Sequence, residues 1–198
     1  MLRSKLRALL LGAGAAVLTT ATALAPTATA AESAPTAGTG TTSASAGFWS
    51  CTVPPGYVFT SVRSTLGCST SGISSQYYVQ PPADGLWACR TAPGFTHTAV
   101  RSTLGCSRSG TAAQYQLRRP ADGLWACRPA PKEGFTHTAV RRTLGCSTSG
   151  TAVQYKLATP KTGLWACTVP TGFTYTGTRS TLGCSTSGTS TQYRLRQY

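Results

Sequence analysis

The hydrophobic and polar residues of the chain alternate over short stretches between residues 48 and 198. At residues 114–118 (QYQLR), Tyr115 and Leu117 alternate with polar side chains. A period of two places successive side chains on opposite faces of a β-strand. The stretch at residues 95–101 (FTHTAVR) is rich in β-branched and aromatic residues, which also favour strands. Turn residues separate these stretches and no window has a helical period, so the pattern predicts an all-β fold of short strands.

The pattern occurs four times in tandem. Each copy begins with Trp-x-Cys, at Trp49, Trp87, Trp125 and Trp165, which gives a period of 38 to 40 residues. Every copy continues with Gly-aromatic, Arg, Thr-Leu-Gly-Cys-Ser, Ser-Gly and Gln-Tyr. Such self-similarity is typical of tandem-repeat proteins. We therefore expect four repeats of about three short strands each, at residues 48–85, 86–123, 124–163 and 164–198.

The eight cysteines fall two to a repeat: Cys51 and Cys68, Cys89 and Cys106, Cys127 and Cys146, and Cys167 and Cys184. Two disulfide pairings suit four equivalent repeats. One joins the two cysteines of each repeat, and the other joins each repeat to the next and closes a ring through Cys51 and Cys184. We favour pairing within the repeat, because a unit of about 40 residues usually needs its own cross-link. Cys-x-x-Cys is absent and histidine is scarce, so we expect no metal and no cofactor.

The motif Thr-Leu-Gly-Cys-Ser contains the second cysteine of every repeat. We expect its leucine to be a core residue and the glycine after it to permit a close approach of the backbone. The Ser/Thr-Gly run that follows is turn chemistry. The leucines concerned are Leu66, Leu104, Leu144 and Leu182. On this interpretation the motif has a structural role.

The N-terminal 30 residues have the features of a cleaved signal peptide. Basic residues at positions 3, 5 and 7 precede a short apolar run at residues 8–18, and Ala-Thr-Ala at residues 28–30 suits signal peptidase. Residues 31–47 consist of Ala, Gly, Ser, Thr, Pro and one Glu, a composition typical of a flexible leader. We expect a secreted, extracellular protein with no membrane insertion after cleavage.

The chain is strongly basic, with a net charge of +14. Fifteen of the 18 basic residues and all four acidic residues lie after residue 30, which leaves +11 for the rest. The first repeat is neutral, whereas the second, third and fourth carry +4, +5 and +3. A solubilising surface is one interpretation of this charge, and contact with a polyanion is the other. The predicted polyanion-binding residues are Arg108, Arg118, Arg119, Arg128, Arg141, Arg142, Lys156, Arg194 and Arg196.

Three recurring side chains have both a structural and a functional interpretation. The tryptophan of each repeat is either an aromatic platform for a ligand or a core residue packed on the disulfide, and the Trp-x-Cys spacing favours the core. The arginine at positions 63, 101, 141 and 179 is either a solvated strand residue or a recognition residue for a trypsin-like protease. His97 and His137 take the place of Phe59 and Tyr175, which favours aromatic packing over chemistry.

No motif for a nucleophile, paired carboxylates or a phosphate-binding loop is present, so we do not expect an enzyme. The sequence predicts a secreted tandem-repeat binding protein that contacts an anionic polymer or surface through a basic face. The ligand classes are a cell-wall polymer, an acidic polysaccharide and extracellular nucleic acid, each bound by several weak contacts. Two alternatives are a secreted inhibitor of trypsin-like proteases and a structural or coat component that self-associates.

Overall fold

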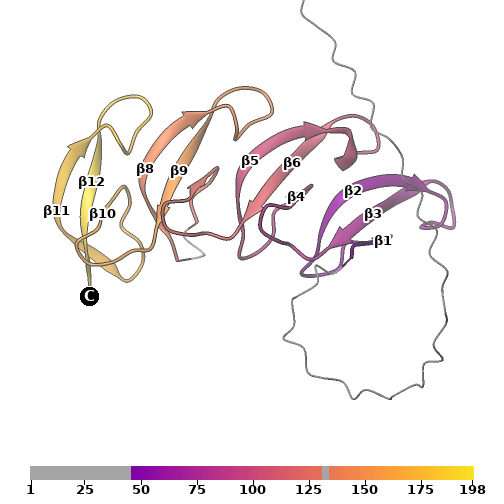
Figure 1. Cartoon of the computed structure of the whole chain (residues 1–198), viewed down its shortest axis with the longest axis horizontal. Coiled ribbons are helices and arrows are strands. Elements are labelled where there is room, and N and C mark those ends of the chain that lie inside the picture. Colours follow the sequence, from indigo (N-terminus) through magenta and orange to yellow (C-terminus); the bar gives the residue numbers. More distant parts are fainter. Residues whose placement is uncertain (1–45, 131–133) are drawn as a thin grey trace, which may run out of the picture. The chain divides into compact units, whose positions relative to one another are not determined.

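A computed structural model describes residues 46–130 and 134–198 of the chain. The predicted signal peptide and nearly all of the predicted leader lie outside these residues. The described part is all-β and forms four three-stranded antiparallel sheets, one from each predicted repeat (Figure 1). The predicted fold class is therefore confirmed. Its one short helix among the described residues is the 3-10 turn η1 (Leu104–Cys106).

Each repeat contributes a short first strand, a long second strand and a central third strand. The first strands are β1 (Phe48–Ser50), β4 (Trp87–Ala88), β7 (Trp125–Ala126) and β10 (Trp165–Ala166). The second strands are β2 (Val58–Thr65), β5 (Thr96–Thr103), β8 (Thr136–Thr143) and β11 (Phe173–Thr181). The third strands are β3 (Ser74–Gln80), β6 (Ala112–Arg118), β9 (Ala152–Ala158) and β12 (Ser190–Gln197).

The third strand lies between the other two in every sheet, as in the order β4-β6-β5. The second strand is therefore an edge strand of its own sheet. Its register with the third strand shifts once, at a β-bulge that leaves one threonine without an opposite partner. These bulge residues are Thr60, Thr98, Thr138 and Thr176.

The four disulfides join cysteines within one repeat, which confirms the favoured pairing. The bonded pairs are Cys51–Cys68, Cys89–Cys106, Cys127–Cys146 and Cys167–Cys184. Each closes a loop of 17 or 19 residues, with Cα–Cα distances of 5.3–5.4 Å. Closing a loop of this size restricts the unfolded chain and stabilises the folded repeat by about 3 kcal/mol.

The buried core of each repeat is small. In repeat 2, Ala88, Ala92, Phe95 and Leu117 are buried together. Val58 from repeat 1 belongs to the same cluster, so the core continues across the junction between the two repeats. The alternation in the third strand correctly places Leu117 in this core, and the equivalent Leu157 and Leu195 are at most 1% exposed.

The leucines of the Thr-Leu-Gly-Cys-Ser motif are not in the core, so the prediction that they are core residues is wrong. Leu66, Leu104, Leu144 and Leu182 are 70–71% exposed. The preceding threonine begins a turn, because its Oγ1 accepts a hydrogen bond from the glycine N–H two residues later, at 3.0–3.1 Å. This turn ends the strand alternation just before the leucine, and the leucine side chain therefore lies outside the sheet face that covers the core.

The Thr-Leu-Gly-Cys-Ser motif also connects neighbouring repeats. The carbonyl of Gly145 accepts a hydrogen bond from the Val100 N–H of the preceding repeat, and Gly183 accepts one from Val140, both at 2.7 Å. The first cysteine of a repeat makes a second connection to the preceding edge strand. The N–H groups of Cys89, Cys127 and Cys167 donate to the carbonyls of Phe59, His97 and His137, each at 2.8 Å. Repeats 2, 3 and 4 are therefore each bonded to the edge strand of the preceding repeat.

Four disulfides are typical of proteins in an oxidising, extracellular environment. No helix within the described residues is both long and apolar enough to cross a lipid bilayer.

Candidate functional site

Every repeat places the guanidinium group of its recurring arginine over the ring of its tryptophan. The distances from the arginine Cζ to the ring centroid are 4.0 to 4.4 Å. The four pairs are Arg63 over Trp49, Arg101 over Trp87, Arg141 over Trp125 and Arg179 over Trp165. An exposed cation–π contact of this kind contributes about 0.5–1 kcal/mol. We call each pair a tryptophan–arginine site.

The glutamine of the Gln-Tyr motif holds the arginine in place. In all four repeats the arginine Nε donates to the glutamine Oε1 at 2.8 Å. In repeats 2 to 4 the glutamine Nε2 also donates to the tryptophan carbonyl, at 3.1–3.3 Å. These three glutamines are only 6% exposed. A buried glutamine therefore fixes Nε of an exposed guanidinium, which has four further N–H donors.

The residue opposite the tryptophan on the central strand differs between repeats. The register pairs Trp49 with Tyr78, Trp87 with Gln116, Trp125 with Lys156, and Trp165 with Arg194. Directly opposite residues of an antiparallel pair lie on the same face of the sheet. In repeats 3 and 4, a second cation therefore lies beside the tryptophan, while repeats 1 and 2 have a neutral residue there.

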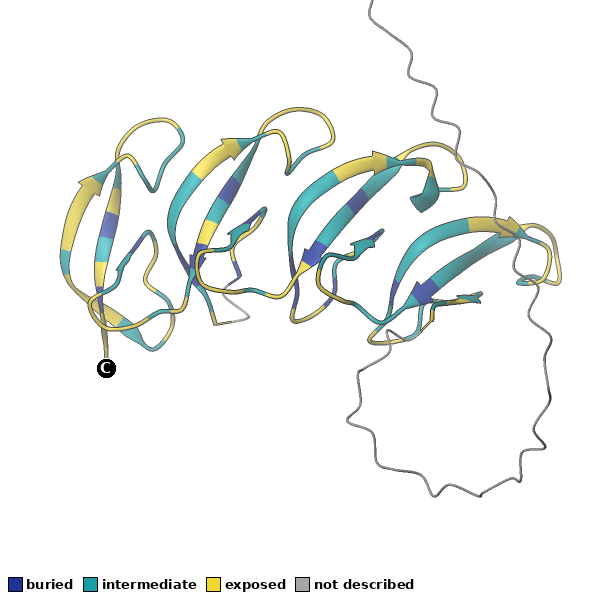
Figure 2. Cartoon of the chain, in the orientation of Figure 1, coloured by how far each residue is buried: buried dark blue, intermediate teal, exposed yellow. Residues whose placement is uncertain are grey.

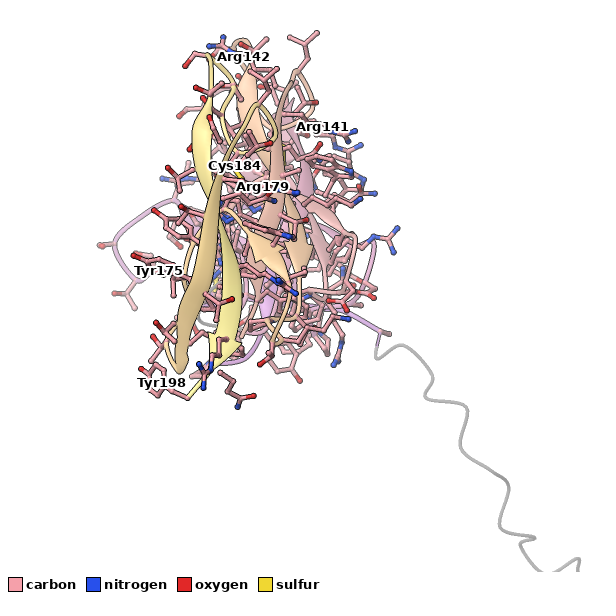
Figure 3. The ribbon with its side chains drawn as sticks, turned by 90° about the vertical axis from the view of Figure 1, so that its left-hand side faces the viewer. Arg141, Arg142, Tyr175, Arg179, Cys184 and Tyr198 are labelled. Atoms are coloured by element: carbon pink, nitrogen blue, oxygen red, sulfur yellow. A yellow bond between two sulfur atoms is a disulfide. The ribbon has the colours of Figure 1, made fainter. Side chains whose placement is uncertain are left out.

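The tryptophans lie on the sheet face opposite the core. The alanine after the tryptophan in repeats 2 to 4 is fully buried, whereas the tryptophans themselves remain partly exposed. Figure 3 views repeat 4 end-on, with Tyr175 on one side of the sheets and Arg141 on the other. The tryptophan therefore does not pack in the core of its repeat. It stacks against the arginine at the surface.

The predicted polyanion-binding residues divide into three groups. Arg141 is part of a tryptophan–arginine site, and Lys156 and Arg194 lie opposite the tryptophan of one. Arg119 instead lies over Phe95, with its Cζ 5.4 Å from the ring centroid. The remaining members are exposed side chains that stack on no tryptophan: Arg108, Arg118, Arg128, Arg142 and Arg196. The structure adds Arg63, Arg101 and Arg179, the equivalents of Arg141 in the other three repeats.

The recurring arginine lies in a β-strand and not in a protruding loop. Arg63, for example, is in β2, and its guanidinium is bonded to Gln76 and stacked on Trp49. To enter the specificity pocket of a trypsin-like protease, the side chain would have to give up both contacts. This geometry does not favour the inhibitor alternative.

The two histidines pack as aromatic residues. The His97 ring lies 5.1 Å from the Tyr115 ring, as Phe59 does from Tyr77 in repeat 1. Burial, and secondarily the charge of Arg128, lowers the pKa of His97 to about 4. Burial also lowers the pKa of His137. Both imidazoles are therefore neutral at neutral pH, and no group of three or more metal-ligating side chains occurs within residues 46–130 and 134–198.

The tryptophan–arginine sites lie on the open surface. Two hollows of about 380 and 430 Å³ lie at the junctions between repeats, and no tryptophan lines either. The tryptophan–arginine sites therefore lie outside both hollows. No protein-family model, curated protein or solved structure matches the chain.

Proposed function

We propose that this protein is secreted and binds an anionic polymer through its four tryptophan–arginine sites. The observation that carries the proposal is the arginine that every repeat holds over a partly exposed tryptophan and bonds through Nε to glutamine. The signal-like N-terminus and the four disulfides support an extracellular site of action.

The site combines two kinds of recognition. A guanidinium group offers paired N–H donors that match the oxygens of a carboxylate, sulfate or phosphate group. The edge of an indole ring provides apolar contact for a sugar ring or a nucleobase. Because glutamine already fixes Nε, less side-chain entropy is lost on binding. Acidic polysaccharides and nucleic acids both present anionic groups beside flat or ring-shaped units.

The four sites differ in charge and therefore in expected affinity. Repeats 3 and 4 place Lys156 and Arg194 opposite the tryptophan, so each of these sites has two cations. Repeat 1 has Tyr78 there and is neutral overall. We expect repeats 3 and 4 to bind most strongly, with the other repeats adding affinity because they are linked to the same polymer-bound chain.

The test is retention of the oxidised chain on immobilised heparin and on isolated bacterial cell wall across a salt gradient. The site variant replaces the four stacked arginines with glutamine: R63Q, R101Q, R141Q and R179Q. The matched control removes the same number of charges from exposed arginines that stack on no tryptophan: R90Q, R108Q, R142Q and R196Q. We expect the wild type to be retained above physiological salt, and the site variant to elute at clearly lower salt than the control.

Three outcomes are informative. Earlier elution of the site variant supports the proposal, provided that its thermal unfolding stays cooperative. Equal elution of the two variants would show that overall charge and not the tryptophan–arginine site drives binding. Elution of the wild type below physiological salt would remove the polymer-binding function altogether. Single-stranded DNA in place of heparin then separates polysaccharide from nucleic acid as the preferred ligand.

A further inference from the structure

The junctions between repeats are built from two complementary faces. At the junction of repeats 3 and 4, the edge strand β8 contributes the carbonyls of His137 and Thr138 and the N–H of Val140. In repeat 4, the Cys167 N–H donates to the first carbonyl at 2.8 Å and the Gln192 Nε2 to the second at 3.2 Å. The Gly183 carbonyl accepts from the Val140 N–H at 2.7 Å.

A fourth contact completes this junction. The hydroxyl groups of Thr136 and Thr168 lie 3.1 Å apart. The junction of repeats 2 and 3 has the same three backbone-directed bonds, from Cys127 to His97, Gln154 to Thr98 and Val100 to Gly145. We call the bulged edge strand of a repeat its outgoing face, and the three groups of the next repeat that bond to it the incoming face. The junctions of repeats 2 and 3 and of repeats 3 and 4 thus share one pairing of these faces, while the junction of repeats 1 and 2 has only the bond from Cys89 to Phe59 among the three.

In repeat 4 the outgoing face, on β11, is not covered by any other described residues. Tyr175 is 51% exposed, whereas the equivalent His137 is 9% exposed. Thr174 is exposed, whereas the equivalent Thr96 and Thr136 are 1% and 4% exposed. Figure 2 shows β11 largely exposed where β5 and β8 are intermediate. An uncovered edge strand is a template for pairing with another chain.

Repeat 1 presents the incoming face with no repeat before it among the described residues. Phe48 is 47% exposed, and Cys51 and Thr52 are exposed. Gln76 is partly exposed, whereas its equivalents in the other repeats are 6% exposed. The groups that a preceding edge strand would meet are therefore present at this end.

We propose that a second copy of this chain binds head-to-tail, with its repeat 1 docked on repeat 4 of the first copy. Position by position, Tyr175 and Thr176 offer carbonyls to the Cys51 N–H and the Gln76 Nε2 of the second copy. Thr178 offers its N–H to the Gly67 carbonyl. Thr174 and Thr52 stand where Thr136 and Thr168 bond at the internal junction.

Charge favours this pairing over other contacts between copies. Repeat 1 is neutral, while the other repeats carry +3 to +5, so repeat 1 is repelled least by the positive repeat 4. The outgoing face at residues 174–178 has no charged residue. Because the two faces differ, each added copy leaves one face of each kind free, and the contact is able to continue into a chain of copies.

The test is sedimentation velocity of the oxidised chain across a wide range of concentration and salt. We expect reversible oligomers that grow with concentration and are favoured by salt, because salt screens the repulsion between positively charged chains. Polymer binding weakens with salt instead, so the two proposals fail or succeed separately.

Two variants identify the interface. T174E places a charge on the outgoing face and T52E on the incoming face, both at exposed positions. We expect each variant alone to be monomeric and their equimolar mixture to form dimers only, because one intact outgoing face then meets one intact incoming face. T189E, at an exposed loop threonine, is the control and should associate like the wild type.

A wild type that stays monomeric at every concentration and salt would overturn the proposal, and would indicate that another segment covers one of the faces. Continued association of T52E or of T174E alone would also overturn it, because it would show a symmetric contact through a single face. Dimers from the mixture together with monomers from each variant alone would support head-to-tail docking.

Discussion

At the scale of single residues, the same side chain has different roles at positions that look alike in sequence. Leu157 lies in an alternating strand and is 1% exposed, whereas Leu144 follows a turn and is 71% exposed. Leu157 packs with Ala126 and Ala130, with Phe135 beside them. Only the strand leucine removes apolar surface from water, and burial of one such side chain is worth about 1.5–3 kcal/mol.

We predict that L157A lowers the free energy of unfolding by about 2–5 kcal/mol, because it leaves a cavity in a small core. L144A should change the unfolding free energy by no more than about 0.5 kcal/mol, because its side chain is already in solvent. Urea denaturation followed by circular dichroism measures both. A loss for L144A as large as that for L157A would show that the exposed leucines are covered in solution.

The recurring glutamine connects the arginine and the tryptophan of its own repeat to the preceding repeat. Gln154 accepts a hydrogen bond from Arg141 and donates to the carbonyls of Trp125 and of Thr98 in the preceding repeat. It therefore joins the tryptophan–arginine site to the junction between repeats. The Gln-Tyr motif indicates a conserved geometry from repeat to repeat, but not which groups the glutamine meets.

At the scale of strands, the β-bulge and the aromatic residue before it shape the junction. Phe59, His97, His137 and Tyr175 hold this position, and each packs edge-on or tilted against the tyrosine of its own repeat at 5.1–5.2 Å. In the first three repeats the carbonyl of the same residue accepts a bond from the next repeat. A change of charge at this position therefore acts directly on a junction.

We predict that the free energy of unfolding decreases as the pH is lowered below about 6.5, because the histidines are then protonated more readily in the unfolded chain. His97 has a pKa of about 4 in the folded protein and 6.5 as its ordinary value. The unfolded chain therefore binds more protons, so the contribution of neutral His97 is complete above pH 6.5 and is lost as the pH falls toward 4. The lowered pKa of His137 acts in the same direction.

The variant that tests this prediction comes from the chain itself. Phenylalanine occupies the equivalent position in repeat 1, so H97F/H137F keeps the aromatic packing and removes the titration. Melting temperatures measured between pH 7 and pH 5 should fall less for this variant than for the wild type. Equal falls for both proteins would exclude the histidines as the cause.

At the scale of the whole molecule, small cores are joined by disulfides and by junctions between neighbours. A repeat of 35 to 40 residues buries few large side chains, and only Leu117, Leu157 and Leu195 are fully buried leucines among the described residues. Stability in such an array is the sum of each repeat and its contacts with its neighbours. Among the described residues, repeats 1 and 4 are each bonded to one neighbouring repeat, whereas repeats 2 and 3 are each bonded to two.

We predict that C127A/C146A lowers the free energy of unfolding by about 2–5 kcal/mol, since it opens the 19-residue disulfide loop of an internal repeat. Guanidinium unfolding of the variant and the wild type measures the loss. The wild type in strong reductant is the companion sample and should unfold at lower denaturant than either. No difference between oxidised and reduced wild type would show that junctions alone maintain the fold.

The sequence by itself determined the strands and the repeats, and it reduced the disulfide pairing to two alternatives. Alternation with a period of two is local, so Tyr115 and Leu117 could be assigned to one strand face from their neighbours alone. Four equivalent units also left only two disulfide pairings, and the size of a unit favoured the correct one.

Only the tertiary structure decided which surfaces are covered. Leu144 is exposed and Thr136 is buried, although hydrophobicity alone suggests the reverse, because the next repeat covers β8 and nothing among the described residues covers the turn after it. The stacking of Arg141 on Trp125 likewise depends on strand register between residues that are 16 positions apart in the sequence. Contacts of this kind arise when distant segments meet, and a local pattern of polar and apolar residues does not contain them.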